Sequence, residues 1–510
     1  MNDETEKQER FDSLQHRLTE QWKAIGSLPS GLEQAMVVVP SINVDIDVPG
    51  LVLQSYEERF LFLLLLLRKP RMRIVYVTSQ PIHPSVVDYY LSLLPGVAVS
   101  HARKRLFEVT PLDGSPRPLS AKLLERPRVL ERIRSLIDVR TTHLVPYNTT
   151  ELERELALRL GIPMYGADPK FFPLGTKTGS RRLFEDEGVP HPLGVEDVHT
   201  LADVVAAIRS IRERHPDATQ MMVKPNEGVS GEGNAVVDLR GLSAPAGDAD
   251  IEQRVRAMSY EASYARYDTY MAKLDQRGGV VEERITGVEF RSPSAQLRIT
   301  PLGGVELLST HDQLLGGPSG QLYLGCRFPA DPAYAPAIMR EAAKVGRRLA
   351  KEGVLGRFAI DFVAVRKEDG DWSVYAIEVN LRKGGTTHPF LTLQFLTSGE
   401  YDAEHGVFVT PSGKPKCYVS SDHVEAHRYR ALGPDDVFDL AFRHGLHFSH
   451  ATQSGIVFHM LATLSELGRM GATAIADTAE EAEALYQKML QVLDAEAGQA
   501  LADPGYPALV

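Results

Sequence analysis

Short hydrophobic runs alternate with stretches of helical pattern along the first third of the chain. The runs at 35–40 and 73–81 flank a leucine-rich stretch at 60–67, which predicts a strand, a buried helix and a strand. A strand-like run at 143–148, followed by a capped helical pattern, repeats this order. Hydrophobic strands joined by helices are typical of a parallel sheet. We therefore expect an α/β domain over residues 1–165.

The central part of the chain mixes helices and strands in an order that does not repeat. Helices are predicted at 176–187, 202–214 and 251–276, and a run of strands continues to about Leu381. The composition changes near Glu400, where a separate C-terminal unit is expected to begin. The predicted units are an α/β domain at 1–165, an α+β domain at 166–400 and a small α+β domain at 401–510.

Composition narrows the class of protein. The 510 residues include 56 Lys and Arg against 67 Asp and Glu, a formal charge of −11, which argues against a nucleic acid as partner. Cys326 and Cys417 have no spacing typical of a disulfide framework or a zinc site. The leucine run is too short to span a membrane, and the charged start lacks a signal-peptide pattern. We expect a cytoplasmic protein without a membrane partner.

A glycine-rich loop lies between two strand-like runs in "MMVKPNEGVSGEGNAVVDL". Its spacing fits neither a P-loop nor a dinucleotide fingerprint, because a β-branched run follows it in place of a helix. Glycine lets the main chain approach phosphate oxygens closely, and Lys224 precedes the loop, so a phosphate lid is one interpretation. A turn with a surface lysine is the other.

Two strand-like runs flank Asp369-Gly370, a strong signal for a two-residue hairpin turn. A turn centred there places Asp361 opposite Glu378, and Asn380 joins them on the same face. Facing carboxylates repel each other, and oxygen ligands of this kind suit Mg²⁺. The alternative is an acidic patch that faces solvent.

The stretch "VVEERITGVEF" adds an apolar strand that runs into acidic residues and a turn. Its backbone is suited to pair with an adenine edge, and Glu289 to accept from ribose hydroxyls. Solvated glutamates near a turn are the ordinary alternative.

Taken in chain order, these motifs resemble the ATP-grasp superfamily over residues 166–389. The resemblance implies a pre-ATP-grasp domain before two subdomains that grip ATP, with a lid at about 177–286. The residues that it assigns to ATP are Lys177, Lys224, Gly228, Ser230, Gly231, Gly233, Glu282, Glu283, Ile285 and Glu289. Those that it assigns to Mg²⁺ are Asp361, Glu378 and Asn380.

A narrower resemblance is to peptide ligases of the pheganomycin-biosynthesis type, through "THDQLLGG", "EVNLRKGGTTHPF" and the tail "GIVFHMLATLSELGRMGATAIADTAEEA". One departure is Ala359, where the D-alanine ligase-like members carry an arginine two residues before the first metal carboxylate. Arg298 and Arg382 are therefore the candidates for stabilising the transition state.

The resemblance implies a carboxylate–amine ligase that forms a peptide or amide bond through an acyl phosphate and releases ADP and phosphate. Its partners would be a small carboxylate and an amine, such as an amino acid or a peptide, and we favour a homodimer. The alternatives are a kinase on the same fold and a non-catalytic ATP-binding regulatory protein.

Histidines invite two further interpretations. His444, His447 and His450 are spaced as HxxHxxH, but Gly445 is expected to end the helix before them, so a zinc site is disfavoured. His388 follows the metal strand within reach of the substrate, and a structural hydrogen bond to the preceding turn explains it equally well.

Overall fold

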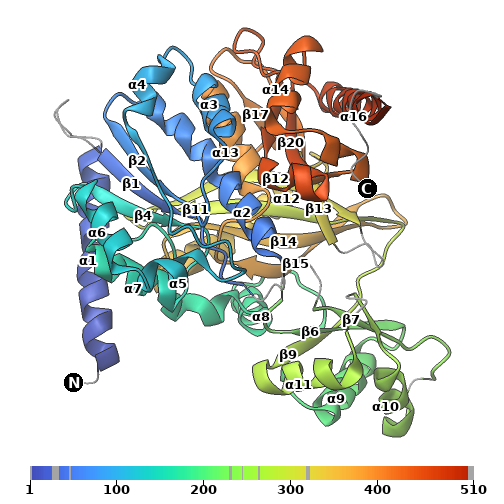
Figure 1. The fold of residues 1–510 in the computed structure, drawn as a ribbon. Helices are drawn as coiled ribbons and strands as arrows, with labels where there is room; N and C mark the ends of the chain where they lie inside the picture. The colour runs from blue at the N-terminus through green and yellow to red at the C-terminus, as the bar shows by residue number, and fades with distance from the viewer. Residues whose placement is uncertain are drawn as a thin grey trace.

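The computed structural model describes residues 3–25, 34–44, 48–228, 233–243, 245–261, 265–316 and 322–502. Figure 1 shows an N-terminal region in blue, a small subdomain in green that stands apart at the bottom, and a large sheet that continues into the C-terminal region. No helix in the described ranges is long and apolar enough to cross a membrane.

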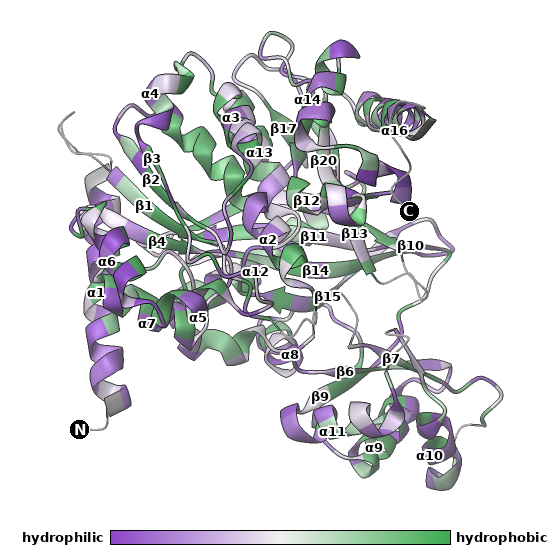
Figure 2. Cartoon of the chain, in the orientation of Figure 1, coloured by the Kyte–Doolittle hydropathy of each residue, from purple (hydrophilic) through white to green (hydrophobic). Residues whose placement is uncertain are grey.

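The N-terminal region is built on four parallel strands in the order β3-β2-β1-β4, which confirms the predicted α/β class. Strands β1 and β2 are hydrophobic and almost fully buried, whereas helix α1 is mostly hydrophilic (Figure 2). The elements are α1 (Asp3–Ile25), β1 (Gln34–Val39), α2 (Gly50–Glu58), η1 (Arg59–Arg68), β2 (Met72–Val77), α3 (Pro84–Ser92), α4 (Val99–Arg103), β3 (Leu106–Val109), α5 (Leu119–Leu124), α6 (Pro127–Ser135), β4 (Thr142–Pro146) and α7 (Glu151–Leu160).

The leucine-rich stretch is buried, as the sequence predicts, but it forms the 3₁₀ helix η1. A segment that is apolar on every side has no face suited to water and must be surrounded by protein. It packs against α2, α3 and α13 in the largest hydrophobic core of the molecule. Arg59, its first residue, is buried with it and enters the site described below.

The subdomain at the bottom of Figure 1 carries an antiparallel sheet in the order β5-β9-β6-β7-β8. The helix predicted at 251–276 is wrong as a single element: α10 ends at Arg256 and α11 begins at Tyr267. Strand β8 lies between them and pairs with the edge of β7, whose backbone groups need partners. Between it and the N-terminal region lie η2 (Pro169–Gly175) and α8 (Lys177–Asp186), which pack on β15 of the large sheet. The elements of the subdomain are β5 (Gly194–Val198), α9 (Leu201–Arg214), β6 (Gln220–Pro225), β7 (Ala235–Asp238), α10 (Asp248–Arg256), β8 (Ser259–Tyr260), α11 (Tyr267–Arg277) and β9 (Gly279–Glu283).

The large sheet has nine strands in the order β10-β14-β11-β12-β13-β18-β20-β19, with β15 paired to β14. Helix α12 packs on β11 and β12, and α13 packs on η1 of the N-terminal region. The elements before residue 400 are β10 (Glu289–Arg291), β11 (Pro293–Ile299), β12 (Val305–Gly316), β13 (Leu322–Phe328), α12 (Ala335–Glu352), β14 (Gly356–Arg366), β15 (Trp372–Asn380) and α13 (Thr387–Thr397).

Three strands of the C-terminal region extend this sheet, and β16 and β17 pair in a separate two-stranded sheet. Strand β18 pairs with β13, with Gly325 opposite Ser421, and β20 and β19 follow outward. The elements are β16 (Glu400–Asp402), β17 (Val407–Val409), β18 (Cys417–Glu425), η3 (His427–Ala431), α14 (Pro434–Arg443), β19 (Gly455–His459), η4 (Leu461–Thr463), α15 (Leu464–Leu467), β20 (Arg469–Ala476) and α16 (Ala479–Ala502). The unit boundaries at 165 and 400 stay predictions.

Candidate active site

The acidic hairpin is formed by β14 and β15. Asp361 lies directly opposite Glu378, and a register shift between Asp361 and Phe362 gives this pairing. Asn380 Nδ2 donates to Asp361 Oδ2 at 2.9 Å, and Gln313 Nε2 of β12 donates to Asp361 Oδ1 at 2.9 Å. The hairpin therefore holds two carboxylates and an amide together on one face of the sheet.

The electrostatics of this face favour a cation. Burial, followed by the neighbouring Glu378 carboxylate, raises the pKa of Asp361 to about 6, and Arg382 and Lys177 oppose the rise. Lys177 Nζ lies 3.2 Å from Glu378 Oε1. Hard oxygen donors that repel one another are the donor set that Mg²⁺ prefers. The residues present therefore fit the ion that the family resemblance implies.

Lys177 comes from the start of α8, where the Thr176 side chain caps the helix by accepting from Gly179 N. The backbone N–H of Thr178 donates to Asn226 Oδ1 at 3.0 Å, which ties this helix to the segment after β6. The sequence-predicted loop begins there. Gly228 and Gly233 line the cleft, whereas Ser230 and Gly231 lie outside the described residues.

Lys224 lies on β6 and is held by a buried ion-pair network. Its Nζ donates to Glu282 Oε1 on the neighbouring strand β9, and Arg181 Nη1 lies 3.2 Å from the other oxygen of Glu282. The Glu282 side chain is 3% exposed, so its charge is matched almost wholly by these two cations. Its carboxylate thus fixes the position of Lys224 in the cleft.

The predicted adenine linker is only partly brought to the cleft. Glu282, Glu283 and Ile285 line it, and the Glu283 carboxylate accepts from the backbone N–H of Leu193 at 3.1 Å. Glu289 does not line the cleft, because its carboxylate is taken up in ion pairs with two arginines of β10 and β14. The predicted contact of Glu289 with ribose has no support in this arrangement.

The two candidate arginines are separated by the fold. Arg298 on β11 pairs with Glu306 and lies over the ring of Trp22 at 5.5 Å, away from the lining of the cleft. Arg382 follows β15, lines the cleft and lowers the pKa of Asp361. Of the two, Arg382 is the one placed near the acidic hairpin.

These groups share a cleft of about 680 Å³, a size typical of small-molecule sites. Its far wall holds residues that sequence reasoning missed: Arg59 from η1, Asp422 from β18 and Arg469 from β20. Arg59 Nη1 donates to Asp422 Oδ2 at 2.6 Å, and its guanidinium lies over the ring of Tyr56 at 4.7 Å. Buried Nε atoms of both arginines and Nη2 of Arg469 have no hydrogen-bond partner. This wall therefore carries two guanidinium groups whose positive charge suits an anion.

Two family models match this chain. The model described as IQCH-like, ATP-grasp matches residues 247–404, and the PGM1 C-terminal domain matches residues 436–489. L-propargylglycine–L-glutamate ligase of Streptantibioticus cattleyicolor is 30% identical over 452 residues, which cover 86% of this chain and 89% of that protein. IQ motif-containing protein H of Danio rerio is 27% identical over 422 residues, 73% of this chain and 39% of that protein.

Solved structures agree on the fold. A biotin carboxylase complex from Campylobacter jejuni has a TM-score of 0.54 at 12% identity and covers 93% of this chain and 96% of its own. The biotin carboxylase domain of Hydrogenobacter thermophilus 2-oxoglutarate carboxylase has a TM-score of 0.53 at 12% identity and covers 90% of each chain. At such identity the likeness shows the fold alone. Together with the ligase relative, these findings show that the chain belongs to the ATP-grasp family of ligases.

Proposed function

We propose that this chain joins a carboxylate to an amine at the expense of ATP, through an acyl phosphate, and releases ADP and phosphate. One observation carries the proposal. A single cleft brings Lys177 of α8 and Lys224 of β6 together with Asp361, Glu378 and Asn380 of the hairpin. Cations suited to phosphates thus face oxygen ligands suited to Mg²⁺.

The nucleotide half of the cleft supplies charge and position. Lys177 and Lys224 would bind phosphate oxygens, while the backbone at Glu283 and Ile285 would pair with the adenine edge. Asp361, Glu378 and Asn380 would hold Mg²⁺, which when bound neutralises charge on the phosphates. Arg382 beside them would stabilise the transferring phosphoryl group. None of these roles requires a nucleophile from the protein.

The reaction balances in two steps. A carboxylate oxygen of the acid attacks the γ-phosphorus of ATP, and the bond from that phosphorus to ADP breaks. The amine nitrogen then attacks the acyl carbon, phosphate leaves, and the nitrogen loses a proton. The glycine loop would exclude water by closing over the bound nucleotide, as the family resemblance implies, because water otherwise hydrolyses the acyl phosphate.

The far wall indicates the chemistry of the acid. Arg59 and Arg469 carry two positive charges there, and Asp422 offsets one of them. A second anionic group on the substrate would be attracted by the remaining positive charge of this wall. The relative named for L-propargylglycine and L-glutamate acts on amino acids, and we propose that this chain likewise joins small amino acids.

The test is a product screen with purified protein, ATP and Mg²⁺. L-glutamate is paired in turn with L-propargylglycine and with each common amino acid, and ADP, phosphate and product masses are scored together. We expect ADP and phosphate in equal amounts and a product one water lighter than its two parents. A phosphorylated product without free phosphate would replace the ligase with a kinase.

Matched glutamine variants on one sheet provide the control. Glu378→Gln removes a carboxylate of the cleft and should abolish turnover, whereas Glu289→Gln removes a carboxylate outside its lining and should retain it. Equal activity in the two variants would contradict the assignment of Glu378.

A further inference from the structure

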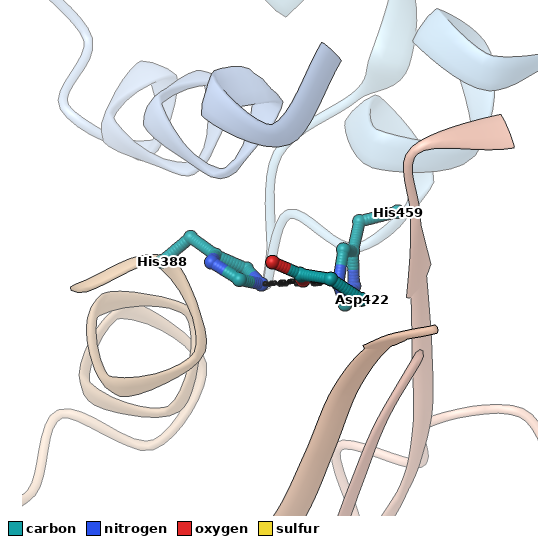
Figure 3. Close-up of side chains that lie close together, drawn as sticks. All are labelled: His388, Asp422 and His459. Carbon is teal, nitrogen blue, oxygen red and sulfur yellow. Dashed lines mark hydrogen bonds and ion pairs between the residues drawn. The ribbon is translucent and has the colours of Figure 1, made fainter. Parts of the chain in front are cut away.

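At the far wall of the cleft, three buried side chains from separate segments converge on one point. His388 lies at the start of α13, Asp422 on β18 and His459 at the end of β19. Figure 3 shows both imidazole rings directed at the Asp422 carboxylate. The residues are 4%, 4% and 3% exposed, respectively. His388 and His459 do not line the cleft, and the proposed reaction does not use them, whereas Asp422 also belongs to the far wall.

The ligand atoms have the spacing of a coordination shell. The two Nε2 atoms are 3.0 Å apart, and Asp422 Oδ1 lies 2.9 Å from His459 Nε2 and 3.5 Å from His388 Nε2. A circle through the three atoms has a radius of about 1.8 Å, so a cation at a bond length of ~2.0–2.1 Å would touch all three from just outside their plane. Little rearrangement is needed.

Hydrogen bonds alone do not satisfy this cluster. If both neutral imidazoles carry a proton on Nε2, two donors face each other at 3.0 Å. If only His388 carries it, the bare His459 nitrogen faces a carboxylate oxygen at 2.9 Å. If only His459 carries it, the proton of His388 is on Nδ1, a buried atom that has no partner. Each of these arrangements leaves one unfavourable contact. A cation bound by both Nε2 atoms would remove the two contacts at the centre of the cluster and would leave the Nδ1–H of His388 as a buried donor without a partner.

We propose that His388, Asp422 and His459 bind one divalent transition-metal ion of the zinc type. Two imidazoles and one carboxylate suit such an ion, whereas Mg²⁺ prefers oxygen ligands alone. Arg59 holds Asp422 Oδ2 at 2.6 Å and leaves Oδ1 to the metal, as orienting partners of metal ligands do. Because Arg59 already balances the carboxylate, we expect weaker binding than at thiolate zinc sites.

A metal at this place would join three parts of the chain. It would tie α13 to β18 and β19, and the residues just before α13, Gly384 to Thr386, line the cleft. The ion would therefore fix the wall at the substrate end and would take no part in phosphoryl transfer. Its fourth position would be open to water.

The experiment uses the full chain and does not depend on ligase activity. Protein stripped with a chelator is titrated with Co²⁺ in excess Mg²⁺ without nucleotide, and absorption and bound metal are measured. We expect one equivalent with the intense visible bands of four-coordinate Co²⁺, displaced by Zn²⁺. No stoichiometric binding, or only the weak bands of six-coordinate Co²⁺, would overturn the proposal.

Variants locate the bound ion. His388→Gln and Asp422→Asn should each lose the one bound equivalent of Co²⁺. The variant His447→Gln, at an exposed residue outside the cluster, should still bind it. Glu378→Gln should also keep it, because that residue belongs to the Mg²⁺ face. Retention in both cluster variants would overturn the site. If they fail to fold by circular dichroism, the wild-type spectrum together with His447→Gln and Glu378→Gln decides the question.

Discussion

Replacing Glu282 with glutamine tests the network that holds Lys224 in the cleft. The side chain of Glu282 is 3% exposed, and its carboxylate is shared by Lys224 and Arg181. Glutamine keeps the shape and removes the charge, so two cations lose their common anion. The strands that carry Lys224 and Glu282 are direct neighbours in the sheet, and the loss should therefore loosen this sheet.

The magnitude follows from burial. Removing one partner of a buried ion pair costs about 3–5 kcal/mol. We expect the lower end, about 3 kcal/mol, because Arg181 keeps Glu196 at 2.5 Å and the carbonyl of Pro192 at 2.8 Å. At 1.36 kcal/mol for each factor of ten, this raises the opening equilibrium of the subdomain by a factor of about 150.

Hydrogen–deuterium exchange with mass spectrometry measures this change in peptides that cover β6 and β9. Glu289→Gln is the matched control, since the Glu289 side chain is 33% exposed and pairs at the surface, where a pair contributes about 0–1 kcal/mol. A loss of protection below about fivefold in Glu282→Gln, or an equal loss in both variants, would refute the reasoning.

Three further predictions concern the cleft. Arg382→Ala should lower kcat by about 100- to 1000-fold while Arg298→Ala stays near wild type, as steady-state kinetics will show. The raised pKa of Asp361, about 6, means that its proton is bound below that pH and released above it. Mg²⁺ must displace this proton, so the Mg²⁺ concentration for half-maximal turnover should rise about tenfold per pH unit below pH 6 and level off above it; a flat profile would contradict the assignment. Arg469→Met should raise KM for the acid by about tenfold or more and leave KM for ATP unchanged, whereas a parallel rise in both would place Arg469 elsewhere.

The acidic face of the hairpin could be predicted because its signals are local, but its register could not. A two-residue turn at Asp369-Gly370 requires Arg366 opposite Ser373, whereas the structure pairs Arg366 with Trp372. The bulge after Asp361 restores the predicted partner, Glu378. Without it Glu378 would face the other side of the sheet. The alternation of polar and apolar residues predicts which side chains share a face of the sheet. It does not reveal the extra residue that forms the bulge.

The far wall of the cleft could not be predicted, because its residues meet only through long-range packing. Arg59 directly precedes an apolar run, and the sequence suggests only a charge that flanks a buried helix. Asp422 and Arg469 lie on strands some 360 and 410 residues later. Their meeting depends on the pairing of β13 with β18 and of β18 with β20. The hydrophobic pattern of a strand does not show which distant strand it pairs with.

The continuation of the large sheet into the C-terminal region has a consequence for how this enzyme can diverge. The acidic hairpin and the strands that carry Asp422 and Arg469 belong to one hydrogen-bonded sheet and line the same cleft. With the proposed binding of the acid by β18 and β20, substitutions there would alter which acid is accepted while the hairpin keeps its geometry. A fragment that ends at residue 400 would lack the strands of that wall and would expose the edge of β13. The C-terminal region therefore cannot be exchanged between enzymes as an independent domain.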